Sequence, residues 1–186
     1  MSTNTTQSSK LTTGKVRFSY LHVWEPDTQG EGEPKYSASL IIPKSDKATL
    51  AKINKAIEVA TQEGKSKKFG NAIPKNLKTP LRDGDEERPE DEAYADCYFL
   101  SARSKNKPLL LNSRKEPISP MEQDTLYSGC YGYASLTFYA YNSNGSKGIA
   151  VALNALMKGG DGEPLGGAKA SAEDFAAITV EDDDLL

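Results

Sequence analysis

"TLYSGCYGYASLTFYAY", residues Thr125–Tyr141, has the alternation of a β-strand, in which successive side chains point to opposite faces. One face of this predicted strand is small and apolar, as a packed core requires, with Ser128 and Gly132 between its apolar members. These members are Leu126, Cys130, Ala134, Leu136, Phe138 and Ala140. The other face holds five of the nine tyrosines of the chain: Tyr127, Tyr131, Tyr133, Tyr139 and Tyr141.

Two interpretations of this tyrosine face are open at this point. Tyrosine has a high strand propensity, so the face can be an ordinary water-facing side of a sheet with aromatic cross-strand pairs. It can equally be a stacking platform, because flat rings at strand spacing suit unpaired nucleobases. The length of the strand predicts a bend at Gly129 or Gly132, as barrels need.

The charge of the chain is unevenly distributed. The formal net charge is −3, but six acidic residues and no basic residue follow Lys169. Seven more acidic residues lie in Asp83–Glu92. By contrast, Gly64–Arg82 and Arg103–Lys115 contain basic residues and no acidic residue. Such blocks usually form a solvated face, but basic windows beside aromatic strands are also the electrostatic pattern of a nucleic-acid-binding protein. With 186 residues, the sequence predicts one domain with polar appendages.

The remaining elements predict a small barrel. A first strand, Gly14–Trp24, would place Val16, Phe18, Tyr20, His22 and Trp24 on one face. A helix with Ser45 as N-cap would stop at Gly64. Further strands are expected at Lys35–Ile42, Tyr94–Arg103, Pro108–Leu111 and Gly148–Met157, with a hairpin at Asn144-Gly145. We therefore expect a mainly β, OB-fold-like five-stranded barrel with one inserted helix and disordered termini, or else a β-sandwich.

Catalytic and metal sites have little support in the sequence. His22 is the single histidine, and it falls inside a predicted strand. Cys97 and Cys130 are expected to be free thiols of a reducing compartment. Asp83, Asp85, Glu86 and Glu87 could hold Mg²⁺ or Ca²⁺, but their spacing is not that of a calcium loop, so a mobile acidic loop is the favoured interpretation. We expect no enzyme, no cofactor and no metal. The N-terminus has no apolar segment of a secretory signal, and no membrane span is expected.

Several ordered motifs resemble a known family. They are PLRDGD from Pro80, YFLSARSKNKP from Tyr98, YSGCYGYASLTFYAY from Tyr127, KGIAVALNAL from Lys147 and the following DGEPLGG. Together they resemble the phage single-stranded DNA-binding proteins over about residues 14–175. The resemblance implies an OB-fold that binds single-stranded DNA without sequence preference in replication or recombination, in the cytoplasm of a bacterial host. It also implies an acidic C-terminal tail, although this one ends in Leu185-Leu186 rather than in an aromatic residue.

These observations give a set of expected domains and sites. Residues 1–13 would be a disordered arm, 14–175 the OB-fold domain and 176–186 the tail. Candidate stacking residues are Tyr131, Tyr133, Tyr139, Tyr141, Tyr98 and Trp24. Candidate phosphate ligands are Lys65, Lys67, Lys68, Arg82, Arg103, Lys105 and Lys107. The candidate tail, which would compete with DNA or recruit replication or recombination proteins, is Glu181, Asp182, Asp183, Asp184, Leu185 and Leu186. The oligomeric state stays open, a homodimer included. The alternative function is a small virion or assembly component with its tyrosines at a protein interface.

Overall fold

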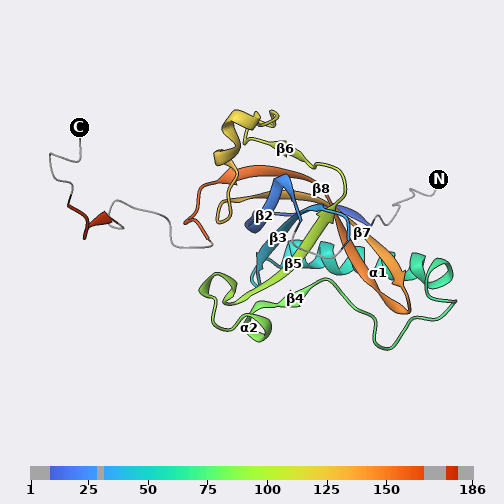
Figure 1. Cartoon of the computed structure of the whole chain (residues 1–186). Helices are drawn as coiled ribbons and strands as arrows, with labels where there is room; N and C mark the ends of the chain where they lie inside the picture. Colours follow the sequence, from blue (N-terminus) through green and yellow to red (C-terminus); the bar gives the residue numbers. More distant parts are fainter. Residues whose placement is uncertain (1–8, 29–31, 166–174, 180–186) are drawn as a thin grey trace.

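The fold is built on five strands that pair in a closed ring (Figure 1). The computed structural model describes residues 9–28, 32–165 and 175–179. The five strands are β2 (Val16–Asp27), β3 (Lys35–Pro43), β5 (Cys97–Ser104), β7 (Tyr131–Ser143) and β8 (Ser146–Gly160). They pair in the order β7-β2-β3-β5-β8, and β8 pairs with β7 again. The contact between β5 and β8 is parallel. The prediction of a mainly β, OB-fold-like barrel is confirmed.

Three short strands extend this ring. They are β1 (Lys10–Thr12), β4 (Arg82–Asp83) and β6 (Leu109–Leu111). β1 pairs with β7, so residues 10–12 belong to the sheet, and their assignment to a disordered arm was wrong. Residues 1–8 lie outside the described residues, and so do residues 180–186 of the tail predicted at 176–186. In the part of the chain that is described, no helix is long and apolar enough to cross a membrane.

The core fills the barrel and extends under one helix. Phe18, Leu40, Leu100, Leu136 and Leu153 come from the five strands of the ring, and each is at most 2% exposed. α1 (Lys47–Lys67) lies against β7 and buries one apolar stripe, as its periodicity predicts.

The two ends of α1 differ from the prediction. Asp46, not Ser45, caps the helix, because its carboxylate accepts the Thr49 amide. The helix also continues past Gly64. A Cβ at Gly64 would lie 2.3 Å from the Cβ of Ala140, so this glycine allows the helix to approach β7 closely rather than ending it.

The tyrosine-rich strand begins later than predicted. A 3₁₀ segment, η2 (Pro120–Thr125), precedes it, and β7 starts at Tyr131. From Cys130 onward the two predicted faces are correct, because Cys130, Ala134, Leu136 and Phe138 are buried. Tyr127 precedes the strand. Its hydroxyl hydrogen-bonds the backbone of Gly162. The Asn144-Gly145 hairpin is confirmed, with both residues at positive φ.

β2 does not keep one face inward, and here the predicted alternation is wrong. Val16 and Phe18 are fully buried, but Tyr20 is 53% exposed and Val23 is buried instead. The cause is a register shift between Ser19 and His22, at which Tyr20 adopts a φ of 46°. An irregularity of this kind exchanges the two faces of a strand, so His22 is only half-buried, while Trp24 packs partly buried against the core.

The acidic segment is folded rather than a mobile loop. It contains α2 (Gly84–Glu87) and η1 (Glu92–Tyr94). Tyr94 therefore lies outside the strand predicted for it, and its ring packs edge-on against Phe99 with 5.0 Å between ring centroids. Asp83 and Asp85 bind the Lys44 ammonium at 3.0 and 2.8 Å.

Candidate nucleic-acid interface

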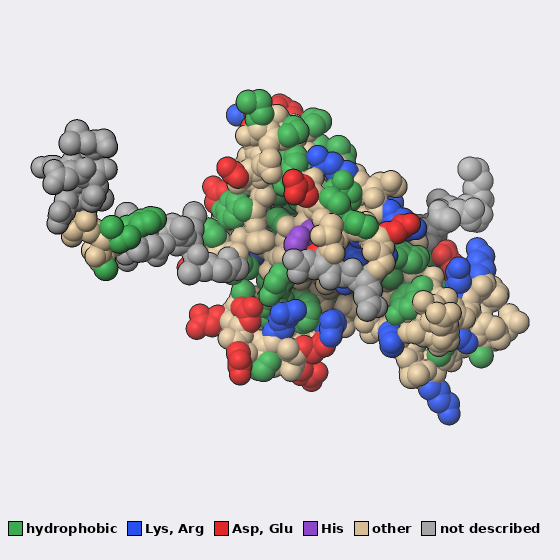
Figure 2. Space-filling model, viewed as in Figure 1, with side chains coloured by type: hydrophobic (Ala, Val, Ile, Leu, Met, Phe, Trp, Pro, Cys, Tyr) green, Lys and Arg blue, Asp and Glu red, His purple; other side chains and the backbone are tan. Residues whose placement is uncertain are grey.

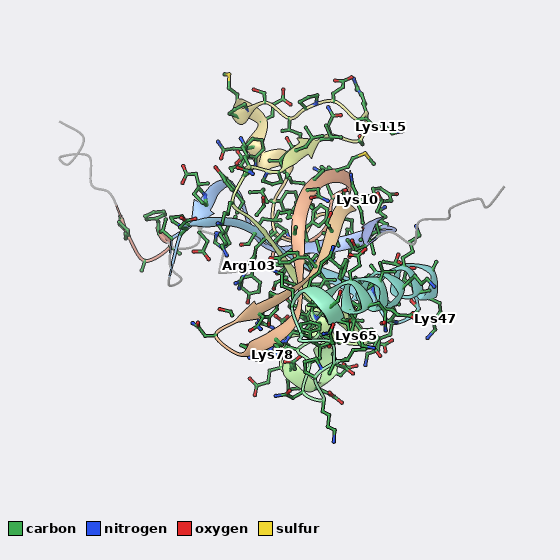
Figure 3. The ribbon with its side chains drawn as sticks, turned by 90° about the vertical axis from the view of Figure 1, so that its right-hand side faces the viewer. Lys10, Lys47, Lys65, Lys78, Arg103 and Lys115 are labelled. Atoms are coloured by element: carbon green, nitrogen blue, oxygen red, sulfur yellow. The ribbon has the colours of Figure 1, made fainter. Side chains whose placement is uncertain are left out.

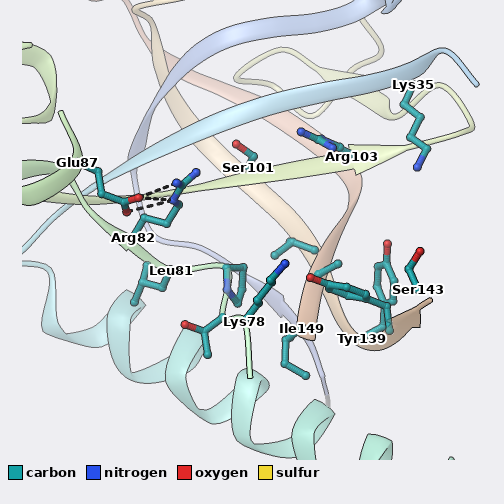
Figure 4. A pocket seen from close by; sticks show the side chains of 15 residues that line it. Lys35, Lys78, Leu81, Arg82, Glu87, Ser101, Arg103, Tyr139, Ser143 and Ile149 are labelled. Carbon is teal, nitrogen blue, oxygen red and sulfur yellow. Dashed lines mark hydrogen bonds and ion pairs between the residues drawn. The ribbon is translucent and has the colours of Figure 1, made fainter. Parts of the chain in front are cut away.

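A hollow lies between the β7–β8 hairpin, β5 and the segment of residues 78–82 (Figure 4). Its volume is about 870 Å³. Tyr139 and Tyr141 line it from β7, Arg103 from β5, and Lys78 and Arg82 from the connecting segment. We call this hollow the cleft.

The cleft exists because β5 and β8 pair at one position only, Arg103 with Ala152. The connecting segment fills the space where the two strands diverge. The Lys78 carbonyl accepts the Ile149 amide at 2.8 Å, and Arg82 pairs with Phe99 at the other end of the segment. A bend of the barrel therefore brings a basic loop to the edge of the aromatic hairpin.

The two tyrosines of the cleft have small neighbours across the hairpin. Tyr139 is opposite Ala150, and Tyr141 is opposite Gly148. Tyr139 is 46% exposed. A Cβ at Gly148 would lie 2.6 Å from the Tyr141 hydroxyl, so this glycine makes room for that ring. Small partners leave ring surface open to the cleft, which is the condition for stacking on a base.

The positive charge of the cleft is only partly neutralised. Arg103 projects beside Ser101 from the outer face of β5, and Lys35 lies at the same end of the cleft in Figure 4. Within the described residues neither Arg103 nor Lys35 has an acidic partner. Arg82 does have one, because Glu87 binds its guanidinium at 2.6 Å. Lys78 donates to the Ser146 hydroxyl at 3.0 Å.

A second hollow of about 200 Å³ continues the cleft across β3 to β2. Both hollows share Ser101 and Arg103. Ser37 and Ser39 of β3 are small polar lining residues, while Tyr20 and Arg88 stand at its edge. The guanidinium of Arg88 lies 5.4 Å from the centroid of the Tyr20 ring. The result is a trough that crosses the outer face of β5, β3 and β2.

Sequence reasoning missed four residues of this trough: Tyr20, Lys35, Lys78 and Arg88. Lys78 was inside a basic window and could have been chosen. Arg88 lies in the acidic run of residues 83–92, where its positive charge is outnumbered by seven acidic residues. Tyr20 faces outward only because β2 changes face, and no pattern in the sequence marks that position.

Three of the predicted stacking residues, Tyr131, Tyr133 and Tyr98, do not line the cleft. The Arg17 guanidinium covers Tyr131 with 5.5 Å to the ring centroid, and a Cβ at Gly159 would lie 3.0 Å from the Tyr133 ring. Tyr98 is half-buried under the Lys44 ammonium.

Trp24 and the predicted lysines also lie elsewhere. The Lys107 ammonium is 4.6 Å from the Trp24 ring centroid. Lys105 pairs with Glu33 at 3.6 Å. Lys65, Lys67 and Lys68 are exposed at the end of α1, where the Lys68 carbonyl accepts the Asn142 amide of the hairpin. Figure 3 shows Lys65 and Lys78 towards the same end of the molecule and Lys115 at the opposite end.

The two cysteines and the acidic segment are the other candidate reactive or metal-binding groups of the sequence. Cys97 and Cys130 are free, as predicted, and burial raises the pKa of both thiols. No group of three His, Cys, Asp or Glu side chains with metal-site geometry occurs in the described ranges. Acidic side chains gather over α2 and η1 (Figure 2), at the end of the cleft where Glu87 stands.

This chain is similar over most of its length to two phage proteins. The protein p50 of Acyrthosiphon pisum secondary endosymbiont phage 1 is 33% identical over 185 residues, covering 95% of this chain and 98% of that protein. The single-stranded DNA-binding protein of bacteriophage Enc34, solved in complex with single-stranded DNA, superposes with a TM-score of 0.75. It is 27% identical and covers 85% of this chain and 90% of its own.

A more distant protein shares the fold alone. The single-stranded DNA-binding protein gp2.5 of bacteriophage T7 has a TM-score of 0.56 at 15% identity, over 93% of this chain and 96% of its own.

The model of a phage family, described as the single-stranded DNA-binding protein of Enterobacter phage Enc34, matches residues 9–186. This chain therefore belongs to the family of the Enc34 single-stranded DNA-binding protein.

Proposed function

We propose that this protein binds single-stranded DNA without sequence preference in the cleft, as a binding protein rather than an enzyme. The observation that carries the proposal is the cleft itself, in which two tyrosines with open rings face an arginine that has no acidic partner among the described residues. A stacked base needs only a π-face, so such a site tolerates any sequence. Family membership supports the proposal.

The roles within the cleft follow from its chemistry. Tyr139 and Tyr141 stack on successive bases, while Arg103 and Lys35 neutralise phosphates at the opposite wall. The serines of β5 and β3 leave a floor wide enough for the sugar-phosphate chain. A duplex has no exposed base faces to stack on, so the site favours unpaired strands.

A salt-dependent titration tests the proposal. Labelled single- and double-stranded oligonucleotides are titrated with the wild type, Arg103→Gln and Arg114→Gln. Arg114 is exposed on the turn that follows β6, outside the cleft, and its substitution removes the same charge. We expect tight binding to single strands only. Arg103→Gln should weaken it and reduce the slope of log K against log salt by about 0.7, while Arg114→Gln should behave as the wild type. Equal affinity for duplex DNA, or no difference between the variants, contradicts the proposal.

The acidic tail fits the same function as a competitor. Residues Glu181–Leu186 carry four carboxylates on the same chain as the cleft, which gives them a high effective concentration there. Binding of a strand would release the tail and expose Leu185-Leu186 to a replication or recombination partner in the cytoplasm of the host cell.

A further inference from the structure

One cation of the cleft is already paired with a carboxylate of the same chain. Among the described residues that line the cleft, Glu87 is the single acid. Its two carboxylate oxygens accept from the Nε of Arg82 at 2.9 and 3.0 Å, and the Nη2 of Arg82 approaches it at 2.6 Å (Figure 4). A carboxylate bound in this way fills the fork of donors that a phosphate would use.

The arginine of this pair is held in place without the glutamate. Arg82 belongs to β4, which pairs with β5. Its guanidinium lies 5.5 Å from the centroid of the Phe99 ring, and Phe99 is 2% exposed in a cluster with Ile41 and Tyr94. The cation therefore stays at the edge of the cleft when its partner leaves.

The glutamate can leave at little cost. Glu87 is the last residue of the four-residue helix α2, and its side chain is 37% exposed. Ion pairs at such exposure contribute little to stability, because water replaces the partner. Arg103, by contrast, has no acidic partner in the described part of the chain.

We propose that Glu87 is a built-in competitor for phosphate, which a single strand must displace from Arg82 as it enters the cleft. The inference rests on the proposed function. The exchange replaces one anion by another at Arg82. This arginine therefore contacts the strand without increasing the number of counterions that binding releases. Glu87 thereby lowers the affinity of the cleft and makes it less sensitive to salt.

The test compares Glu87→Gln with Glu86→Gln on the full chain. Both changes remove one negative charge from adjacent exposed positions, but Glu86 does not line the cleft. Glu87→Gln should bind a single-stranded oligonucleotide roughly two- to fivefold more tightly at low salt. Its salt slope should be steeper than that of Glu86→Gln by about 0.7, because Arg82 now enters the complex uncompensated. Replacing Arg82 by Gln in the Glu87→Gln background should abolish the extra gain.

The outcomes separate the two proposals. If the wild type does not retain single strands, the proposed function fails. If the wild type binds but Glu87→Gln matches Glu86→Gln, the function stands and the competitor role is wrong. Weaker binding by Glu87→Gln, with unchanged thermal unfolding, would also overturn it, because Glu87 would then contact the strand directly.

Discussion

The two halves of the tyrosine face should contribute very differently to DNA binding. Replacing Tyr139 and Tyr141 together by alanine removes both rings that line the cleft. Stacking contributes about 1–3 kcal/mol per base. Tyr139 is 46% exposed and can offer a full face, whereas Tyr141 is half-buried across Gly148 and should contribute near the lower limit. The pair should therefore lose about 2–4 kcal/mol, or roughly 30- to 1000-fold in affinity.

The matched control is the other tyrosine pair of the same strand. Tyr131 and Tyr133 lie eight residues back along β7, roughly 26 Å at strand spacing, and outside the cleft. Their replacement by alanine should change affinity by less than about threefold. It should lower stability instead, because Arg17 and Gly162 pack on the Tyr131 ring and Gly159 packs on the Tyr133 ring.

Fluorescence anisotropy with a labelled single strand measures both variants, and urea unfolding checks that each is folded. If the control pair loses more affinity than the cleft pair while both stay folded, the strand binds at the other end of β7. The assignment of the cleft would then be refuted.

Three further predictions concern packing, pH and the tail. Gly64→Ala should destabilise the protein by about 1–3 kcal/mol in urea unfolding, since its Cβ would overlap Ala140; wild-type stability would contradict the close approach. The pKa of Asp85 is held below its usual value, chiefly by the Asp96 amide that donates to it, so its stabilisation is present near pH 7 and lost on acidification. Asp85→Asn should be less stable than the wild type at pH 7 in thermal unfolding, and the two should converge below about pH 4; a constant difference would exclude this carboxylate as the cause. Deleting residues 181–186 should tighten binding of single strands at low salt in the anisotropy assay; unchanged affinity would argue against competition by the tail.

Local patterns predicted correctly the faces of β7 and the turn that follows it. The alternation from Cys130 to Phe138 identified the buried and open faces of β7, because a strand with one face in a core has a fixed period of two. Asn144-Gly145 identified the hairpin, because both residues tolerate the positive φ that the turn requires. The same reasoning failed at Tyr20, where an irregularity in β2 exchanged the faces.

By itself, the sequence determined the barrel class, the faces of the tyrosine strand and the family to which its motifs are similar. The tertiary structure decided which tyrosines and which basic side chains lie close together. Lys78 reaches Gly148 and Arg103 reaches Ala152 through strand pairings between distant parts of the chain. Such contacts depend on how the barrel closes, and Arg82 faces Glu87 because α2 folds back beside β4. The charge of a segment can be counted along the chain, but whether a cation is free or already paired depends on three-dimensional neighbours.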